Sequence, residues 1–438
     1  MNKEFLQQLN KFVSFKSIST DKTFLPEIKK TVEWLKETLE GGGFEVEILT
    51  GQTCNPVVFA TYSKLKGAKT VMVYGHYDVQ PASIKDGWDA DPFTLTEKNG
   101  KLLARGVVDN KGQILIHIHT VLNLIKEGKL KYNMKFLIEG NEETSNNDLP
   151  KILKVNKAEL KCDYILISDG EIPYQPTLEY SLRGGFNSTL TFQTAKNNMH
   201  SGIYGGAVPN AAYELSKFLG KLFTADNKVA VPGFYDGVDP ITKAQLKDNK
   251  AFVEASRDIA KHTGIQKLLL EKGLDFSTQT GLRPTLQITG FKSGYIDEGY
   301  ANIVPAKAEA RINFRVVTSQ DPEKIFKKFE GFVKKNTPSY VKWELKHSGV
   351  HSPVRVNISS EIFEDVRKLL AQAYGSKALT KSVGGAIPVV SDFKEILGVD
   401  SLLVSLGNDD CNMHGANENF DIGLLEKGLK FSRLFFGV

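Results

Sequence analysis

Histidine and carboxylate residues recur in this sequence just past apolar, strand-like segments or at helix starts. In GHYDVQP, His76 and Asp78 follow the apolar run VMVY. The other clusters are ARGVVDNKG with Asp109, IEGNEETSN with Glu142 and Glu143, ISDGE with Asp169, and DDCNMHGANE with His414. Imidazole and carboxylate groups together suit divalent ions such as zinc, manganese or cobalt. The clusters therefore indicate a site for one or two metal ions, provided that the fold brings them together.

The spacing within two of these clusters gives each side chain a separate task. In an extended segment, residues i and i+2 point to the same side, so His76 can bind a metal while Asp78 accepts its other ring N–H. Glu142 and Glu143 are adjacent, and neighbouring like charges are unfavourable unless a cation or a proton separates their roles. The pair is therefore a candidate for a metal ligand beside a general base.

Each cluster also has a structural explanation when it is taken alone. Asp109 precedes an apolar helical stretch and could cap that helix. A Glu-Glu pair such as Glu142 and Glu143 is most often a solvated turn, and Asp169 before a glycine is a common turn residue. His414 could be an ordinary polar loop residue. The repetition of such clusters after successive strands is what favours a shared site.

The elements that would position these residues follow an α/β pattern up to about residue 183. The expected strands are VVFATY, TVMVYG, NMKFLI and YILISD, and the helical stretches that alternate with such strands include EIKKTVEWLKETLEGGG, before the first strand, and KGQILIHIHTVLNLIKEG. This alternation predicts a mostly parallel sheet covered by helices. The carboxyl ends of such strands share one edge, so the polar clusters that follow them should converge there.

The pattern changes between residues 184 and 350. Alternating strands such as FNSTLTFQTA, PTLQITGF and KAEARINFRVV surround helices near PNAAYELSKFLGKLF and DPEKIFKKFEGFVKK, which predicts an α+β unit. From 351 to 438 the first pattern returns. We therefore predict one α/β domain formed by residues 1–183 and 351–438, with residues 184–350 inserted as a second domain.

Length, charge and cysteine content exclude several classes of protein. A chain of 438 residues with 41% hydrophobic residues can bury a large core. Its 56 basic and 51 acidic residues are spread without the basic blocks of a nucleic-acid groove, so a small-molecule or peptide partner is expected. No segment resembles a signal peptide or reaches the ~18 apolar residues of a membrane span. The 3 cysteines are far apart, which fits a reducing cytoplasm.

Beyond these patterns, the sequence resembles a known family of co-catalytic metallopeptidases. The family contains cytosolic nonspecific dipeptidase, carnosinase, carboxypeptidase G, aminoacylase and succinyl-diaminopimelate desuccinylase. The motifs that carry the resemblance span nearly the whole chain in family order: GHYDVQP, WDADPF, ARGVVDNKG, EGNEE, SDG, MHSGIYGG, NIVPAKAEARINFR, GGAIP and MHGANE. The dipeptidase branch is the most similar, because it shares the tyrosine of GHYDVQP and a long inserted domain. The resemblance implies a zinc-peptidase domain with an inserted, ferredoxin-like lid that forms a homodimer.

The resemblance also implies two divalent ions per subunit, zinc first, with manganese or cobalt as alternatives. His76 and Asp169 would hold one ion, and Glu143 and His414 the other. Asp109 would bridge both. The peptide bond that follows Asp109 is expected to be cis, as in the family.

Three further residues would act in catalysis. The resemblance implies that Glu142 is the general base, which takes a proton from the attacking water and passes it to the departing amine. Asp78 would orient the ring of His76. His200, in MHSGIYGG, would donate a hydrogen bond to the oxyanion, and in dimeric relatives this histidine comes from the lid of the other subunit. Without the flanking SGIYGG, His200 would be an ordinary helix or turn histidine.

Substrate contacts are expected from the inserted domain and from one late loop. Arg315 resembles the arginine that grips the terminal carboxylate of the substrate, although a surface arginine on a strand is the alternative. Asn302 occupies a position that often helps to bind the same carboxylate and is often threonine in dipeptidases. In GGAIP, Gly385 and Ala386 are further candidates, but close dipeptidases have serine in place of Ala386. This missing hydroxyl leaves the substrate open.

Three functions are compatible with these features. The first is metal-dependent hydrolysis of dipeptides, or very short peptides, with a free C-terminal carboxylate. The second is removal of an acyl or succinyl group from an amino acid, which uses the same amide chemistry; the long lid and GHYDVQP favour the first. The third is a binding protein that has kept the fold without the chemistry. The presence of all the ligands, the base and His200 argues against it.

Overall fold

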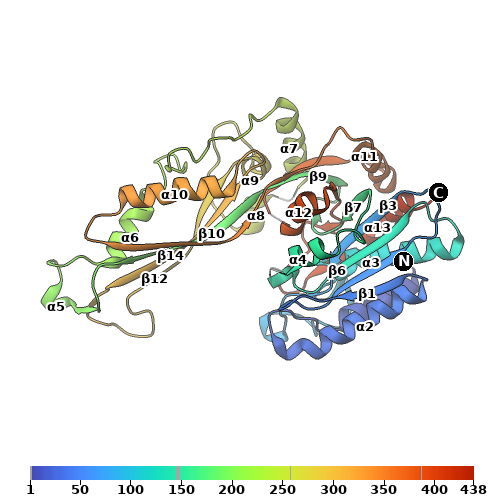
Figure 1. Ribbon diagram of the computed structural model, residues 1–438, viewed down its shortest axis with the longest axis horizontal. Coiled ribbons are helices and arrows are strands. Elements are labelled where there is room, and N and C mark those ends of the chain that lie inside the picture. The colour runs from blue at the N-terminus through green and yellow to red at the C-terminus, as the bar shows by residue number, and fades with distance from the viewer. Residues whose placement is uncertain (1, 145–147, 257, 386) are drawn as a thin grey trace.

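Two β-sheets divide the chain between a broad helix-covered body and an elongated extension (Figure 1). The computed structural model describes residues 2–144, 148–256, 258–385 and 387–438. The body contains both ends of the described chain and the C-terminal part of the sequence, whereas the extension is formed by the middle of the chain. None of the helices in these ranges combines the length and the apolar character needed to cross a membrane.

The body is built on a sheet of 9 strands within the described residues. In spatial order they are β1 (Glu45–Leu49), β2 (Val57–Tyr62), β6 (Asn133–Glu139), β3 (Thr70–His76), β7 (Tyr164–Ile167), β18 (Ser401–Leu403), β9 (Thr177–Leu182) and β16 (Val354–Arg355), with β17 (Leu379–Val383) also paired to β9. The centre, from β6 to β18, is parallel. The pairs β1–β2, β2–β6, β18–β9 and β9–β16 are antiparallel, so the sheet is more mixed than the alternation of elements indicated.

Helices cover both faces of this sheet, which is why the central strands read as unbroken apolar runs. Along β3, Val71 and Val73 face one apolar core, while Met72 and Tyr74 face the other. The first core is closed by α1 (Lys3–Ser14), α2 (Leu25–Gly41), α3 (Lys111–Glu127), α11 (Glu361–Tyr374) and α13 (Ile422–Phe436). The second is closed by α4 (Leu149–Val155) and α12 (Pro388–Asp392). A strand buried on both sides leaves its polar residues to the strand end.

The extension has its own antiparallel sheet and its own core. Its strands, in spatial order, are β12 (Thr285–Ser293), β14 (Lys307–Val316), β10 (Gly184–Gln193) and β15 (Lys342–His351). The helices α6 (Ala211–Gly220) and α10 (Pro322–Asn336) pack on one face, where Leu215 and Phe329 are fully buried (Figure 1). The order β-α-β-β-α-β and the strand pairing are those of a ferredoxin-like unit.

Short elements complete the structure. The helices α7 (Lys243–Ala255), α8 (Ile259–Thr263) and α9 (Phe276–Leu282) connect α6 to β12. At the far tip of the extension lie α5 (Ser201–Tyr204), β11 (Met199–His200) and β13 (Ile303–Val304) (Figure 1). Further small sheets are a three-stranded one, formed by β4 (Thr96–Lys98), β5 (Lys101–Leu103) and β20 (Asn419–Asp421), and a two-stranded one, formed by β8 (Glu171–Ile172) and β19 (Gly407–Asn408).

Candidate metal centre

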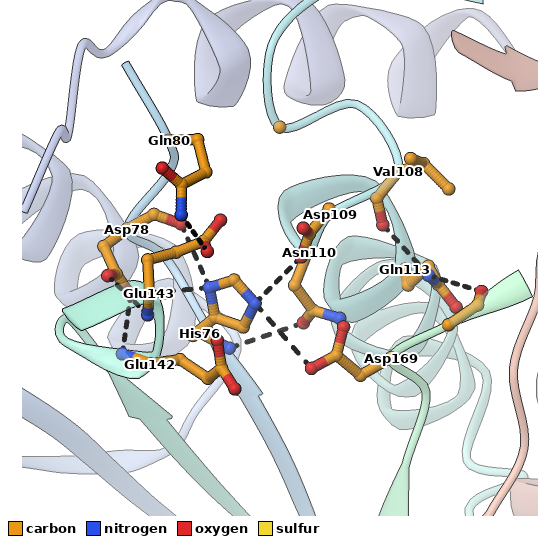
Figure 2. A network of polar contacts seen from close by, with 12 residues as sticks. His76, Asp78, Gln80, Val108, Asp109, Asn110, Gln113, Glu142, Glu143 and Asp169 are labelled. Carbon is orange, nitrogen blue, oxygen red and sulfur yellow. Dashed lines mark hydrogen bonds and ion pairs between the residues drawn. The ribbon is translucent and has the colours of Figure 1, made fainter. Parts of the chain in front are cut away.

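The polar clusters meet where three parallel strands end. His76 is the last residue of β3 and lies in register with Glu139, the last residue of β6. Glu142 and Glu143 form the short helical turn that follows β6, and Asp169 follows β7. Figure 2 shows these side chains pointing toward one another around His76. The convergence expected at one edge of the sheet is therefore present.

His76, Asp109 and Asp169 form one group with metal-ligand spacing, and their ligand atoms all lie within 4.8 Å of one another. Nε2 of His76 lies 3.1 Å from Oδ1 of Asp109 and 3.7 Å from Oδ2 of Asp169. His76 and Asp109 are buried, and Asp169 is nearly so. Three donors therefore face one small space.

A second group of the same kind contains Asp109, Glu143 and His414. Nε2 of His414 lies 2.9 Å from Oδ2 of Asp109 and 3.3 Å from Oε2 of Glu143. Asp109 thus directs one carboxylate oxygen to each group. This is the arrangement expected of a bridging ligand.

Electrostatics provide a test of whether these residues fit a metal. Burial and the charge of Asp109 raise the pKa of Glu143 to about 7, and the same two causes raise the pKa of Asp169 well above its ordinary value. Burial disfavours ionised Asp109 too, but hydrogen bonds from His414 and His76 hold its pKa well below the usual range. A divalent ion would offset the repulsion among these carboxylates. Two imidazoles and three carboxylates therefore fit a pair of borderline divalent ions.

The loop around Asp109 does not use this residue as a helix cap. Asn110 occupies the cap position of α3 and makes no capping hydrogen bond with its side chain. Its Nδ2 instead donates to the carbonyl of Ser168 at 2.7 Å. The peptide bond between Asp109 and Asn110 is cis, as expected. The capping explanation of Asp109 is therefore wrong.

Asp78 is buried, and it contacts other groups in addition to the ring of His76. Nδ1 of His76 lies 3.0 Å from the backbone oxygen of Asp78 and 3.4 Å from its Oδ1. The carboxylate also accepts the backbone N–H groups of Glu142 and Glu143, each at 3.2 Å, and the hydroxyl of Ser19 at 2.6 Å. Asp78 therefore links the end of β3 to the turn that carries both glutamates (Figure 2).

Glu142 faces a cleft of about 620 Å³ between the body and the base of the extension. Arg315, on β14, lines the same cleft. Burial raises the pKa of Glu142, and the charge of nearby Asp109 raises it further. Gly385 is exposed in the loop after β17, while Ala386 lies outside the described residues. Ile387, which follows, lines the cleft.

His200 and Asn302 lie close to each other, but neither lies at the cleft of its own chain. His200 pairs with Ile303 in the β11–β13 ladder, and the carbonyl of Asn302 accepts the N–H of Ser201 at 2.9 Å. His200 is exposed, and its Nδ1 accepts the N–H of Gly202 at 3.1 Å. Such a local bond is also what an ordinary helix or turn histidine would make. Figure 1 shows α5, which follows His200, at the end of the extension farthest from α3 and β3. Neither residue lines the cleft that holds Glu142 and Arg315.

Several residues beside the site were not expected from the sequence. Gln80 donates from Nε2 to Oε2 of Glu143 at 2.7 Å. His351 lines the cleft, and its buried Nε2 has no hydrogen-bond partner among the described residues. Glu418 accepts hydrogen bonds from Arg105 and from the Asp109 loop. Glu418 follows His414 within MHGANE, and Gln80 belongs to GHYDVQP, so these motifs could have indicated both residues. His351 lies in no such motif.

Comparisons with known proteins identify relatives of the whole chain. A Cys-Gly metallodipeptidase of Saccharomyces cerevisiae is 28% identical over 98% of this chain and 93% of its own length. Human Beta-Ala-His dipeptidase is 28% identical over 99% of this chain and 89% of its own. The solved structure of an M20 family metallo-carboxypeptidase from Sulfolobus solfataricus has a TM-score of 0.88 at 28% identity and covers 99% of this chain and 98% of its own. The sequence profile described as peptidase family M20/M25/M40 matches residues 72–436. The α/β class is thereby confirmed, and the chain belongs to peptidase family M20/M25/M40.

Proposed function

We propose that the protein is a metallodipeptidase that hydrolyses the amide bond of dipeptides, or very short peptides, with a free C-terminal carboxylate. The observation that carries this proposal is the pair of metal-ligand groups that share Asp109, with Glu142 and Arg315 lining the adjoining cleft. The relatives named as Cys-Gly and Beta-Ala-His dipeptidases support the substrate class. Removal of an acyl group from an N-acyl amino acid is the alternative that this support disfavours.

The ligands in this proposal are His76 and Asp169 for one ion, Glu143 and His414 for the other, and Asp109 for both. Zinc is the first candidate, with manganese or cobalt as alternatives, because all three accept imidazole and carboxylate. When bound, such ions lower the pKa of a water molecule and polarise the amide carbonyl.

The side chains of the chain then perform the proton transfers and the positioning. A carboxylate oxygen of Glu142 accepts a proton from the attacking water and returns it to the nitrogen of the departing amine. Asp78 holds the N–H groups of the turn and thereby fixes the position of Glu142. The guanidinium of Arg315 binds the C-terminal carboxylate of the substrate through two parallel hydrogen bonds. Gly385 lies in the loop before Ile387, which lines the cleft, and we propose Gly385 and its neighbour in the sequence, Ala386, as further substrate contacts.

A substrate panel tests the reaction class. Dipeptides, N-acetyl and N-succinyl amino acids and tetrapeptides would be compared with zinc, manganese or cobalt added to the metal-free protein. Dipeptides should give the highest kcat/KM, and a dipeptide with a C-terminal amide should be a poor substrate because Arg315 loses its anionic partner. Faster hydrolysis of the N-acyl amino acids would establish the deacylase instead.

We further propose a homodimer in which the extension of one subunit supplies His200 and Asn302 to the site of the other. The distance of α5 from the body supports this, because His200 does not reach the cleft of its own chain (Figure 1). The edge strand β12 and the loop after it expose large apolar side chains, which suits a self-complementary contact. These side chains are Ile288, Phe291, Tyr295, Ile296 and Tyr300. His200 would donate a hydrogen bond to the carbonyl oxygen as negative charge develops there.

Subunit exchange tests this arrangement. His200→Ala and Glu142→Gln proteins should each be inactive alone. In a heterodimer, one site combines an intact Glu142 with a donated His200. Random pairing of equal amounts should therefore restore up to about a quarter of the wild-type activity, on the two-fold logic of such a dimer. No recovery despite proven exchange would show that His200 does not act across the dimer.

The cytoplasm is the location that we propose. Cys54, Cys162 and Cys411 are all free, which suits a reducing compartment. Fractionation of cells that express the tagged protein would test this assignment.

A further inference from the structure

A buried ion pair lies beside the metal centre and has no part in the proposed chemistry. Arg105 and Glu418 are 313 positions apart in the sequence, and Nη1 of Arg105 donates to Oε2 of Glu418 at 2.7 Å. Their side chains are only 3% and 0% exposed. Removing two charges from water is costly, and apolar residues of similar volume often stabilise a fold as well as a buried pair does. The role of the pair is therefore better inferred from the groups that it contacts than from its contribution to stability.

Glu418 holds the loop that ends in Asp109. Its Oε2 accepts the N–H of Gly106 at 3.0 Å, in addition to the Arg105 guanidinium. Its Oε1 accepts the N–H groups of Val108 at 2.9 Å and of Asp109 at 3.1 Å. One carboxylate thus fixes the backbone of the residue that both metal-ligand groups share.

Arg105 connects this loop to two others. Its Nη2 donates to the backbone oxygens of His414 at 3.1 Å, Gly415 at 3.2 Å and Pro81 at 3.4 Å. Pro81 is the last residue of GHYDVQP. Its carbonyl accepts a hydrogen bond from the same guanidinium that binds the His414 loop. The guanidinium also lies over the ring of Trp88, 5.4 Å from its centre. The pair thus joins the loop of Asp109, the loop of His414 and the end of GHYDVQP, the segment that also contains His76.

His414 needs such support more than the other ligands do. Its φ of 63° lies in the left-handed region, which is unfavourable for a residue other than glycine. Its side chain is 54% exposed, so surrounding side chains do not fix the ring by packing. By contrast, His76 is the last residue of a central strand, and Asp169 follows another. The bonds from Arg105 to the carbonyls of His414 and Gly415 hold the backbone of this loop, in addition to the contacts that the ring makes with Asp109 and Glu143.

We propose that Arg105 and Glu418 are positioning residues for the metal centre. They set the separation of Asp109 and His414 before any ion binds, and so they determine the affinity of the group formed by Asp109, Glu143 and His414. The proposal rests on the proposed dimetal function. Loosening the pair weakens this group more than the group of His76, Asp109 and Asp169, because two ligands of the latter are carried by the central sheet.

Two conservative variants test the proposal. Arg105→Lys keeps a positive charge beside Glu418, but one ammonium group cannot reproduce the planar fork that reaches the carboxylate and the backbone oxygens together. Glu418→Gln keeps the shape of the side chain but places an NH2 group against N–H donors. Arg283→Lys is the matched control, because Arg283 makes two bonds to Glu271 at 2.9 and 3.1 Å in the partly buried region near α9.

The measurement is a titration of the full-length, metal-free proteins with zinc by calorimetry and with cobalt by absorption. Wild-type protein should bind two ions. Each variant should lose about 10- to 100-fold in affinity for one ion and keep the other, which is the usual effect of changing a residue that supports metal ligands. In excess metal, KM should match the wild type and kcat should recover. The Arg283→Lys protein should titrate as the wild type does.

Unchanged affinity for both ions in a folded variant would overturn the proposal. Equal weakening of both ions, together with a large fall in Tm, would overturn it as well, because the pair would then support the whole fold. If one variant fails to fold, the other provides the measurement. Wild-type protein that binds no divalent ion would instead refute the metal centre itself, so the two failures are distinguishable.

Discussion

Replacing Asp78 by asparagine should damage catalysis without removing any metal ligand or the base. The carboxylate of Asp78 accepts three hydrogen bonds, from the N–H groups of Glu142 and Glu143 and from the hydroxyl of Ser19. An amide has only one accepting oxygen. Whichever way the side chain of Asp78→Asn turns, its NH2 group faces one of the two backbone N–H groups and leaves it without an acceptor.

The size of the effect follows from this lost bond. A buried donor that loses its acceptor costs about 1–3 kcal/mol. Since the turn carries both the proposed base and a proposed ligand, this cost should appear as a loss of about 5- to 150-fold in kcat/KM. Part of it should be recovered by excess metal, because Glu143 is displaced together with Glu142.

The assay compares kcat/KM for a dipeptide at rising zinc concentration in wild-type, Asp78→Asn and Ser19→Ala proteins. Ser19→Ala is the control, because it removes only the hydroxyl and keeps both N–H groups bonded; its loss should be less than about fivefold, the lower end of the same range. Circular dichroism and Tm would show that all three are folded. Wild-type kcat/KM and metal affinity in Asp78→Asn would refute this account of the turn.

The remaining predictions concern the metal, the adjacent glutamates, the substrate carboxylate and the cleft wall. Removal of metal by a chelator should abolish hydrolysis and added zinc should restore it; full activity of protein shown by elemental analysis to be metal-free would contradict the proposal. Glu142→Gln should bind both ions and lose about 10²- to 10⁴-fold in kcat. Glu143→Gln should instead lower the affinity for one ion in a calorimetric titration. Near wild-type turnover by Glu142→Gln would exclude Glu142 as the base. Arg315→Lys should raise KM for a dipeptide by about 10- to 150-fold, as expected for a lost charged hydrogen bond, and should leave KM for the dipeptide amide unchanged. Burial, with Glu395 nearby, raises the pKa of Asp392 in the cleft wall from 3.8 to about 6. Ionisation of Asp392 therefore opposes folding, and its contribution to stability should be lost as pH rises from about 4 to about 6. The Tm of Asp392→Asn relative to the wild type should rise over that range; a difference in Tm that does not change with pH would show that Asp392 is not responsible.

The parts of the fold that follow from the sequence are those with a local pattern. The run VMVYGH predicts both a strand buried on two faces and a polar residue at its end, because the apolar, buried middle of β3 leaves room for His76 only where the strand ends. The same reasoning places Glu142 after β6 and Asp169 after β7. Parallel pairing then brings these residues together without further information.

The parts that could not be predicted depend on pairing between distant segments. Nothing local shows that β1 and β2 run antiparallel to their neighbours, because an apolar strand has the same pattern in either direction. The contact between Arg105 and Glu418 joins segments 313 positions apart, and each residue alone resembles an ordinary loop charge. Asp109 could be read as a helix cap for the same reason. Its role depends on His76 and His414, neither of which is near it in the sequence.

The placement of α5 at the tip of the extension has a consequence for how activity depends on concentration. If the site is completed only by a second copy, each isolated chain is an inactive half of the enzyme. Dilution below the dissociation constant of the dimer should then lower the activity per milligram, and the rate should rise with the square of protein concentration. A newly synthesised chain would then acquire peptidase activity only after it dimerises with a second copy.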